Sequence, residues 1–216
     1  MKIQIKNTYL LAFLFLLFAS SAQAQEVENE FQTRTSFTAK TKLFKNFKLS
    51  VSPEFRFDEN LSLDKYLLEA KASYKLFDYF SLGAGYRFYG NKRETKSTEY
   101  YNRYSLSAKY ERSFYQFDPS IKVSYSNFSD DDSDSNLLRY KAAVKYNIKK
   151  SKFSPYAGLE AFQETDGGDL AKMRYFLGTD YKICKKNYIQ ASYKFDYFQN
   201  EFKNKHIVSI GYKLKF

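Results

Sequence analysis

The chain has 216 residues, of which 44% are hydrophobic and 20% aromatic, with 21 Tyr, 22 Phe and no Trp. This aromatic content departs from that of an ordinary soluble globular domain, and it favours strands and membrane–water interfaces. The formal net charge is +11, but no compact Lys/Arg cluster is present, so nucleic-acid binding is not indicated. The mean hydropathy of −0.60 does not exclude a membrane barrel, because such a barrel hides its apolar residues in alternation.

Residues 1–24 have the features of a secretory signal peptide. Lys2 and Lys6 give a positive start, residues 9–18 are apolar, and Ala22-Gln23-Ala24 matches a cleavage site. The apolar run is shorter than the about 20 residues that span a bilayer. We therefore expect an exported protein whose barrel domain comprises residues 25–216, with a charge two units below that of the full chain.

Apolar residues alternate with polar ones throughout the rest of the chain, which is the periodicity of a strand with one apolar face. No sustained apolar helical period of 3.6 is present, and the apolar faces carry no Asp, Glu, Lys or Arg. The pattern predicts eleven strands, at residues 31–43, 47–57, 66–76, 80–88, 100–110, 115–125, 138–148, 153–161, 171–183, 189–197 and 206–216.

The connections between these strands alternate in length. Short turns are expected near Lys45, Asp78, Arg112, Lys150 and Lys185, and longer polar loops at 58–64, 90–99, 129–136, 164–170 and 199–205. This predicts an all-β, antiparallel up-and-down barrel of about 10–12 strands. Bacterial single-chain barrels have an even number of strands. An eleventh strand therefore leaves three alternatives: residues 25–30 thread the lumen, the first segment is not a full wall strand, or a strand has been overlooked.

Alternation alone does not decide which face points outward, because a soluble lipocalin-like barrel has apolar residues inside. The polar faces are rich in Lys, Arg, Glu and Ser, as a hydrated lumen requires. Aromatic residues gather at the strand ends as they do in the girdles of membrane barrels. At the short-turn end these are Phe44, Phe47, Phe77 and Phe80, and at the long-loop end Phe57, Tyr66, Phe88 and Tyr100. These features favour a transmembrane barrel with short periplasmic turns and longer extracellular loops.

The last eleven residues, HIVSIGYKLKF, form a one-sided apolar strand that ends on an aromatic residue. This stretch resembles the closing strand of Gram-negative outer-membrane β-barrels. The resemblance implies that Tyr212, Leu214 and Phe216 act as an assembly signal for the barrel-assembly machinery. The whole chain from residue 25 resembles the small, largely uncharacterised, porin-like outer-membrane barrel families. No catalytic motif is shared, so no functional residues carry over, and the implied partners are outer-membrane lipid and lipopolysaccharide.

The alternation also predicts which charged residues face the lumen, and bases outnumber acids among them. They are Lys65, Glu69, Lys71, Lys75, Arg87, Arg103, Lys109, Glu111, Lys122, Arg139, Lys141, Lys145, Glu160, Lys172, Arg174, Asp180, Lys182, Lys194, Asp196 and Lys213. Rings of Lys and Arg set anion preference, so one interpretation is a narrow, anion-preferring, porin-like channel. The alternative is a closed barrel, held by ion pairs across the lumen, that serves as a structural or surface-binding module.

No enzyme, cofactor or metal site is predicted. His206 is the single histidine, and Ser209 lies on the opposite face of its strand, so a hydrolase is the weakest hypothesis. The acidic run 129–136 lacks the Gly and Glu of a calcium loop, which excludes an EF-hand; a solvated loop tip is expected, with weak divalent-cation binding beside lipopolysaccharide as the alternative. Gly83, Gly85 and the pair Gly167-Gly168 begin no helix, which excludes a phosphate loop. Cys184 is the single cysteine and has no disulfide partner.

Overall fold

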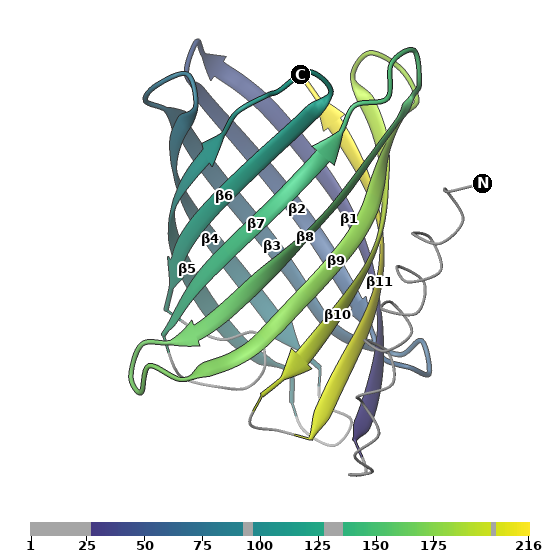
Figure 1. The fold of residues 1–216 in the computed structure, drawn as a ribbon. Coiled ribbons are helices and arrows are strands. Elements are labelled where there is room, and N and C mark those ends of the chain that lie inside the picture. The colour runs from purple at the N-terminus through teal and green to yellow at the C-terminus, as the bar shows by residue number, and fades with distance from the viewer. Residues whose placement is uncertain (1–26, 93–96, 128–135, 200–201) are drawn as a thin grey trace, which may run out of the picture.

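The computed structural model describes residues 27–92, 97–127, 136–199 and 202–216, and it contains eleven strands (Figure 1). The predicted signal peptide at residues 1–24 lies outside this part of the chain. The strands are β1 (Glu28–Phe44), β2 (Phe47–Phe57), β3 (Leu63–Lys75), β4 (Phe80–Asn91), β5 (Glu99–Glu111), β6 (Phe117–Ser126), β7 (Leu137–Tyr146), β8 (Phe153–Glu164), β9 (Leu170–Lys182), β10 (Asn187–Phe198) and β11 (Lys203–Lys215). Among the described residues, no helix is long and apolar enough to cross a membrane.

The eleven strands form one closed barrel in which every sequential pair is antiparallel. The ring closes between β1 and β11, which pair in parallel from Glu28 opposite Lys203 to Lys40 opposite Lys215. Because β1 is a wall strand from Glu28 onward, two of the expected alternatives are wrong: residues 28–30 do not thread the lumen, and the first segment is a full strand. The described wall has an odd number of strands, closed by one parallel seam.

Because the number of strands is odd, the first strand begins and the last strand ends at opposite rims of the barrel. β11 ends at the rim of the short turns, and β1 begins at the rim of the longer loops (Figure 1). The turn between β1 and β2 consists of Lys45 and Asn46, whereas β2 and β3 are separated by residues 58–62. The strands have 10–17 residues, which is enough to cross a membrane at a tilt.

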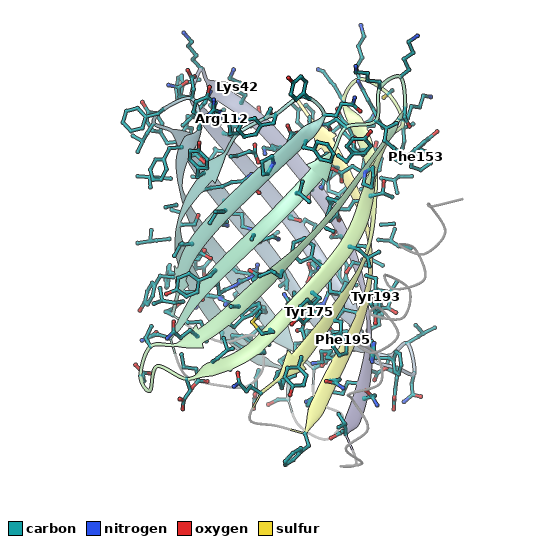
Figure 2. The ribbon with its side chains drawn as sticks, in the orientation of Figure 1. Lys42, Arg112, Phe153, Tyr175, Tyr193 and Phe195 are labelled. Carbon is teal, nitrogen blue, oxygen red and sulfur yellow. The ribbon has the colours of Figure 1, made fainter. Side chains whose placement is uncertain are left out.

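The apolar side chains of the wall point away from the lumen (Figure 2). Phe31, Leu106, Ile121 and Leu177 are exposed on the outer surface, and apart from Phe44 beside its turn every exposed large apolar strand residue belongs to a predicted apolar face. Charged residues are instead buried on the opposite face. A soluble barrel buries its apolar face inside, so the distribution excludes that alternative and is the one expected of a barrel in lipid.

Aromatic rings flank this outer band at both rims, as predicted. Phe44 and Phe47 meet at the short-turn rim, with ring centroids 6.4 Å apart. Phe88 and Tyr100 stack at 5.6 Å near the long-loop rim, where the Tyr100 hydroxyl also lies 3.4 Å from that of Tyr66. Rings at these depths are suited to the polar–apolar boundary of a bilayer.

The sixth strand begins later than the sequence pattern predicted. Phe114 and Phe117 exchange backbone hydrogen bonds of 2.7 and 2.8 Å, which makes Tyr115 and Gln116 the tip of a tight hairpin. Tyr115 has a φ of +53° and is fully exposed. The alternation of apolar and polar residues continues through the turn, because a tip of two residues keeps the following strand in the same phase.

Candidate functional site: the barrel lumen

Three adjoining cavities fill the lumen between the middle of the barrel and the short-turn rim. The central cavity, of about 360 Å³, lies against β3–β8. The seam-side cavity, of about 300 Å³, shares Arg139, Lys141 and Glu160 with it. The mouth cavity, of about 540 Å³, shares Lys71 and Lys122 with the central cavity and extends to turn residues. The three cavities therefore lie next to one another, from mid-barrel to the short-turn rim.

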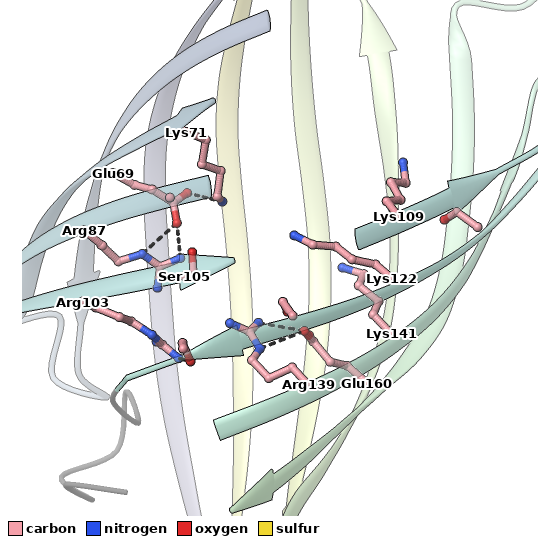
Figure 3. A pocket seen from close by; sticks show the side chains of 14 residues that line it. Glu69, Lys71, Arg87, Arg103, Ser105, Lys109, Lys122, Arg139, Lys141 and Glu160 are labelled. Atoms are coloured by element: carbon pink, nitrogen blue, oxygen red, sulfur yellow. Dashed lines mark hydrogen bonds and ion pairs between the residues drawn. The ribbon is translucent and has the colours of Figure 1, made fainter. Parts of the chain in front are cut away.

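The sequence-predicted lumen residues are distributed over the three cavities and the two ends of the barrel. The central cavity is lined by Glu69, Lys71, Arg87, Arg103, Lys109, Lys122, Arg139, Lys141 and Glu160 (Figure 3). The seam-side cavity adds Arg174 and Lys194, and the mouth cavity adds Lys75 and Glu111. Asp180 binds Lys145 and Lys213 at 2.7 and 3.2 Å towards the short turns. Lys65, Lys172 and Asp196 are buried at the loop end, and Lys182 is exposed at the end of β9.

Side chains from all eleven strands are buried in the half of the lumen next to the long loops. We call this layer the loop-end plug. It comprises Gln32, Arg34, Arg56, Lys65, Leu67, Tyr89, Arg103, Ser126, Leu137, Phe162, Lys172, Arg174, Asp196, Phe198 and Ile207. Tyr89, Asp196 and Ile207 are 0% exposed. At the opposite end Lys40, Lys48 and Lys71 face the lumen and are exposed. The lumen is thus open at the short-turn rim and blocked by side chains at the loop end.

Ion pairs hold the seam side of the plug. Arg174 donates from Nε and Nη2 to the two carboxylate oxygens of Asp196, at 2.5 and 2.6 Å. Lys172 lies 3.5 Å from the same carboxylate. On the neighbouring strand β8, Glu160 accepts hydrogen bonds of 3.1 and 2.7 Å from Arg139. The two-point pairing of Arg174 with Asp196 fixes both partners and satisfies charges that water does not reach.

Aromatic rings fill the rest of the plug and pack against its cations. The Tyr89 hydroxyl accepts hydrogen bonds from Arg87 at 2.6 Å and Arg103 at 3.3 Å. The Lys172 ammonium lies 4.9 Å from the ring centroids of both Phe162 and Phe198. Cations on aromatic faces are stabilised where water is excluded. The plug is therefore a packed, hydrogen-bonded layer.

One wall of the mid-lumen carries two aromatic residues that the sequence analysis did not single out. Tyr156 and Phe176 lie 6.3 Å apart on neighbouring strands, and Tyr156 accepts a hydrogen bond from Gln190 at 2.5 Å. A Cβ atom at Gly158 would collide with the Phe176 ring, and one at Gly178 with Tyr156. The available signal was a lumen-facing glycine opposite a lumen-facing aromatic residue, since the small residue makes room for the ring.

The remaining residues considered in the sequence analysis have surroundings typical of structural rather than catalytic groups. His206 stacks on Phe31 at 4.8 Å and bonds the Tyr193 hydroxyl through Nδ1 at 2.6 Å, on the outer surface. Gly168 has a φ of +74° in the β8–β9 loop, as a turn glycine should. The acidic run lies outside the described residues except for Asn136. Within the described residues, no group of three or more His, Cys, Asp or Glu side chains could hold a metal ion.

The predicted assembly-signal residues lie on the outer face of the last strand. Tyr212 stacks with Phe37 across the seam at 5.7 Å, and Leu214 shares that face. Phe216 follows β11 with its side chain 66% exposed, and its backbone N–H donates to the Lys40 carbonyl at 2.8 Å. The closing residue is therefore held by its backbone while its ring stays accessible.

A closed barrel with an apolar exterior and a charged interior defines the class of transmembrane β-barrels. Within that class, residues 31–206 match the family described as "Protein of unknown function (DUF2490)", and the chain belongs to that family. Among solved structures, the chain is similar to the β-domain of the Bordetella autotransporter BrkA. The identity is 13%, the match covers 79% of this chain and 82% of that one, and the TM-score is 0.45. A search of curated proteins found no match.

Proposed function

We propose that the protein is an integral outer-membrane β-barrel of a Gram-negative bacterium that acts as a closed binding module rather than as an enzyme or an open pore. The loop-end plug carries this proposal, because all eleven strands contribute buried side chains to it. A barrel of about eight strands is just filled by side chains, and 16–18 strands leave a channel. Eleven strands fill one half of this lumen and leave the other half hydrated.

The orientation and the export route belong to the same proposal. Short turns face the periplasm and longer loops face the outside in barrels of this class. In that orientation the exposed mouth, with Lys40 and Lys48, opens to the periplasm and the plug faces the cell exterior. The predicted signal peptide delivers the chain to the periplasm, where the barrel-assembly machinery inserts it beside lipopolysaccharide.

A narrow, anion-preferring channel is the second candidate, favoured by the excess of bases in the lumen. The central cavity is lined by seven Lys and Arg side chains and by two acids, Glu69 and Glu160. Conduction through this barrel requires the plug to rearrange. The two candidates therefore differ in what an unmodified barrel does in a planar bilayer.

Single-channel recording separates them. We expect the wild-type barrel to show no steady, salt-dependent current. A variant combining Tyr89→Ala and Phe162→Ala, which removes two buried rings of the plug, should conduct because water then reaches the loop end. The matched control combines Tyr156→Ala and Phe176→Ala, which removes two lumen rings outside the plug and should stay silent.

Heat-modifiable migration in detergent gels shows that each variant is folded before it is recorded. A steady wild-type current would overturn the closed barrel in favour of the channel. In that case a reversal potential in a salt gradient tests its anion preference.

A further inference from the structure

Three lysines lie directly opposite one another on neighbouring strands inside the barrel. Lys109 of β5 is opposite Lys122 of β6, and Lys122 is opposite Lys141 of β7. Lys122 and Lys141 project side by side into the central cavity (Figure 3). Like charges directly opposite across a sheet destabilise it. The row therefore needs a counter-charge.

The carboxylates near this row are already engaged. Glu160, the residue opposite Lys141 on β8, is bonded by Arg139 and also lies 4.0 Å from Arg174. Glu69 is bonded by Arg87 and Lys71.

The three lysines of the row differ in their contacts. Lys109 pairs with Glu111. In the part of the chain that the structure describes, Lys122 makes no ion pair or hydrogen bond, and the contact of Lys141 is with the Phe176 ring, 4.3 Å from its ammonium. Glu160 is the nearest carboxylate to both ammonium groups, but it forms its ion pairs with Arg139 and Arg174, so neither lysine has an ion pair of its own among the described residues.

We propose that the central cavity binds a compact polyanion, bearing two or more phosphate or carboxylate groups, through Lys122 and Lys141. This deepens the proposed function and rests on it, because a blind cavity holds a solute instead of passing it. The hydroxyls of Ser105, Ser120 and Ser124 line the same cavity and are hydrogen-bond donors for anionic oxygens. A ligand neutralises the lysine row and receives charge-assisted hydrogen bonds from it.

The shape of the lumen restricts the ligand to small, wholly polar anions. The cavity of about 360 Å³ is in the range of small-molecule sites. Its lining consists of charged residues, serines and a glycine, so an acyl chain would find no apolar partner there. The mouth cavity, with Lys40, Lys48 and Lys71, leads to it from the short-turn rim. The anion therefore enters as a soluble species from that side, and the plug stops it.

Isothermal titration of the folded barrel in detergent tests the site, with inorganic pyrophosphate as one probe and citrate as the other, in the absence of divalent cations. The two probes distinguish a phosphate ligand from a carboxylate ligand. Saturable binding of at least one is expected. Lys122→Gln and Lys141→Gln should each weaken it about tenfold, since hydrogen bonds to charged groups are worth about 1.5 kcal/mol or more and 1.4 kcal/mol is tenfold.

The matched control is Lys149→Gln, which removes one charge from the exposed β7–β8 turn and should leave the affinity unchanged. Absence of saturable binding for both probes, or equal weakening by the control, would overturn the site. The urea midpoint of Lys122→Gln without anion should equal or exceed that of the wild type, because repulsion in the row is relieved. A lower midpoint would make Lys122 a structural residue and also overturn the proposal.

The same preparation is placed in planar bilayers, which keeps the two proposals separable. A silent barrel without binding refutes the polyanion site and leaves the closed barrel standing. A barrel that binds pyrophosphate and conducts steadily refutes the closed barrel and supports the site.

Discussion

Asp196 is the most deeply buried charged residue in the part of the chain that the structure describes, with 0% exposure, so its carboxylate depends on protein partners. Both of its oxygens accept hydrogen bonds from Arg174, and Lys172 lies beside it. Strand alternation predicts that these three residues face the lumen. It does not predict their burial, because depth along a strand depends on where the long side chains of the other strands meet.

We therefore expect Asp196→Ala to lower the free energy of unfolding by about 3–5 kcal/mol, since it removes the nearest carboxylate of two buried cations, Arg174 and Lys172. Asp180→Ala is the matched control, because Asp180 also accepts from two cations but lies in the hydrated half. Its effect should be smaller, because Lys145 and Lys213 are partly exposed and water can solvate them when the carboxylate is removed. Urea unfolding followed by heat-modifiable migration measures both values. Equal losses at the two positions would contradict the distinction between plug and hydrated lumen.

At the scale of the element, the seam between β1 and β11 is paired as continuously as the antiparallel ladders. Stacked rings cover it outside, with Phe31 on His206 and Phe37 on Tyr212. On the lumen side Glu30 pairs with Lys203 and, at 2.9 Å, with Lys205. The parallel edge is therefore sealed by contacts on both faces as well as by its backbone.

Deleting Phe216 tests whether the C-terminal residue is read during assembly. Its ring is exposed and makes little packing contact, so the stability of the folded barrel should change little. If the ring is an assembly signal, the amount of heat-modifiable barrel in the outer membrane should fall several-fold. Phe114→Ala, which removes an exposed ring from a short turn, is the control and should assemble normally. Unchanged assembly after the deletion would refute the signal.

The strands were predictable because each has one apolar face that alternates with a polar face. Period two and the absence of charge from the apolar faces predicted all eleven, within a few residues at their ends. Parallel closure was not predicted, because bacterial single-chain barrels have an even number of strands and the eleventh segment was therefore treated as an exception to the wall. The row formed by Lys109, Lys122 and Lys141 was hidden because it depends on register between strands, and each strand alone shows only that its lysine faces inward.

For the whole molecule, the single cysteine of the chain reports which rim faces the cell exterior. Cys184 lies exposed in the β9–β10 turn at the short-turn rim. Hydrogen bonds from the Lys186 backbone N–H and the Asn187 side-chain amide lower the pKa of its thiol. A lower pKa raises the thiolate fraction at neutral pH, so the residue should react readily with a maleimide.

We expect a charged, membrane-impermeant maleimide to label Cys184 only after the outer membrane is permeabilised. A variant carrying Cys184→Ser and Asn60→Cys moves the thiol to the exposed β2–β3 loop and should be labelled in intact cells. Gel shift of the labelled protein measures both. Labelling of Cys184 in intact cells, without labelling of the Asn60→Cys variant, would place the short turns outside the cell and refute the proposed orientation.

The odd wall also limits how the chain could be reconnected. Where both ends of a barrel lie at one rim, a short linker allows circular permutation, with new ends placed at any turn. Here a linker from the end of β11 to the start of β1 must span the wall, roughly 33 Å for thirteen residues tilted by about 40°. That is about ten extended residues, whose unpaired backbone the bilayer excludes and whose path through the lumen the plug blocks. Rearranged chains of this barrel therefore require an added twelfth strand, which returns the second end to the first rim.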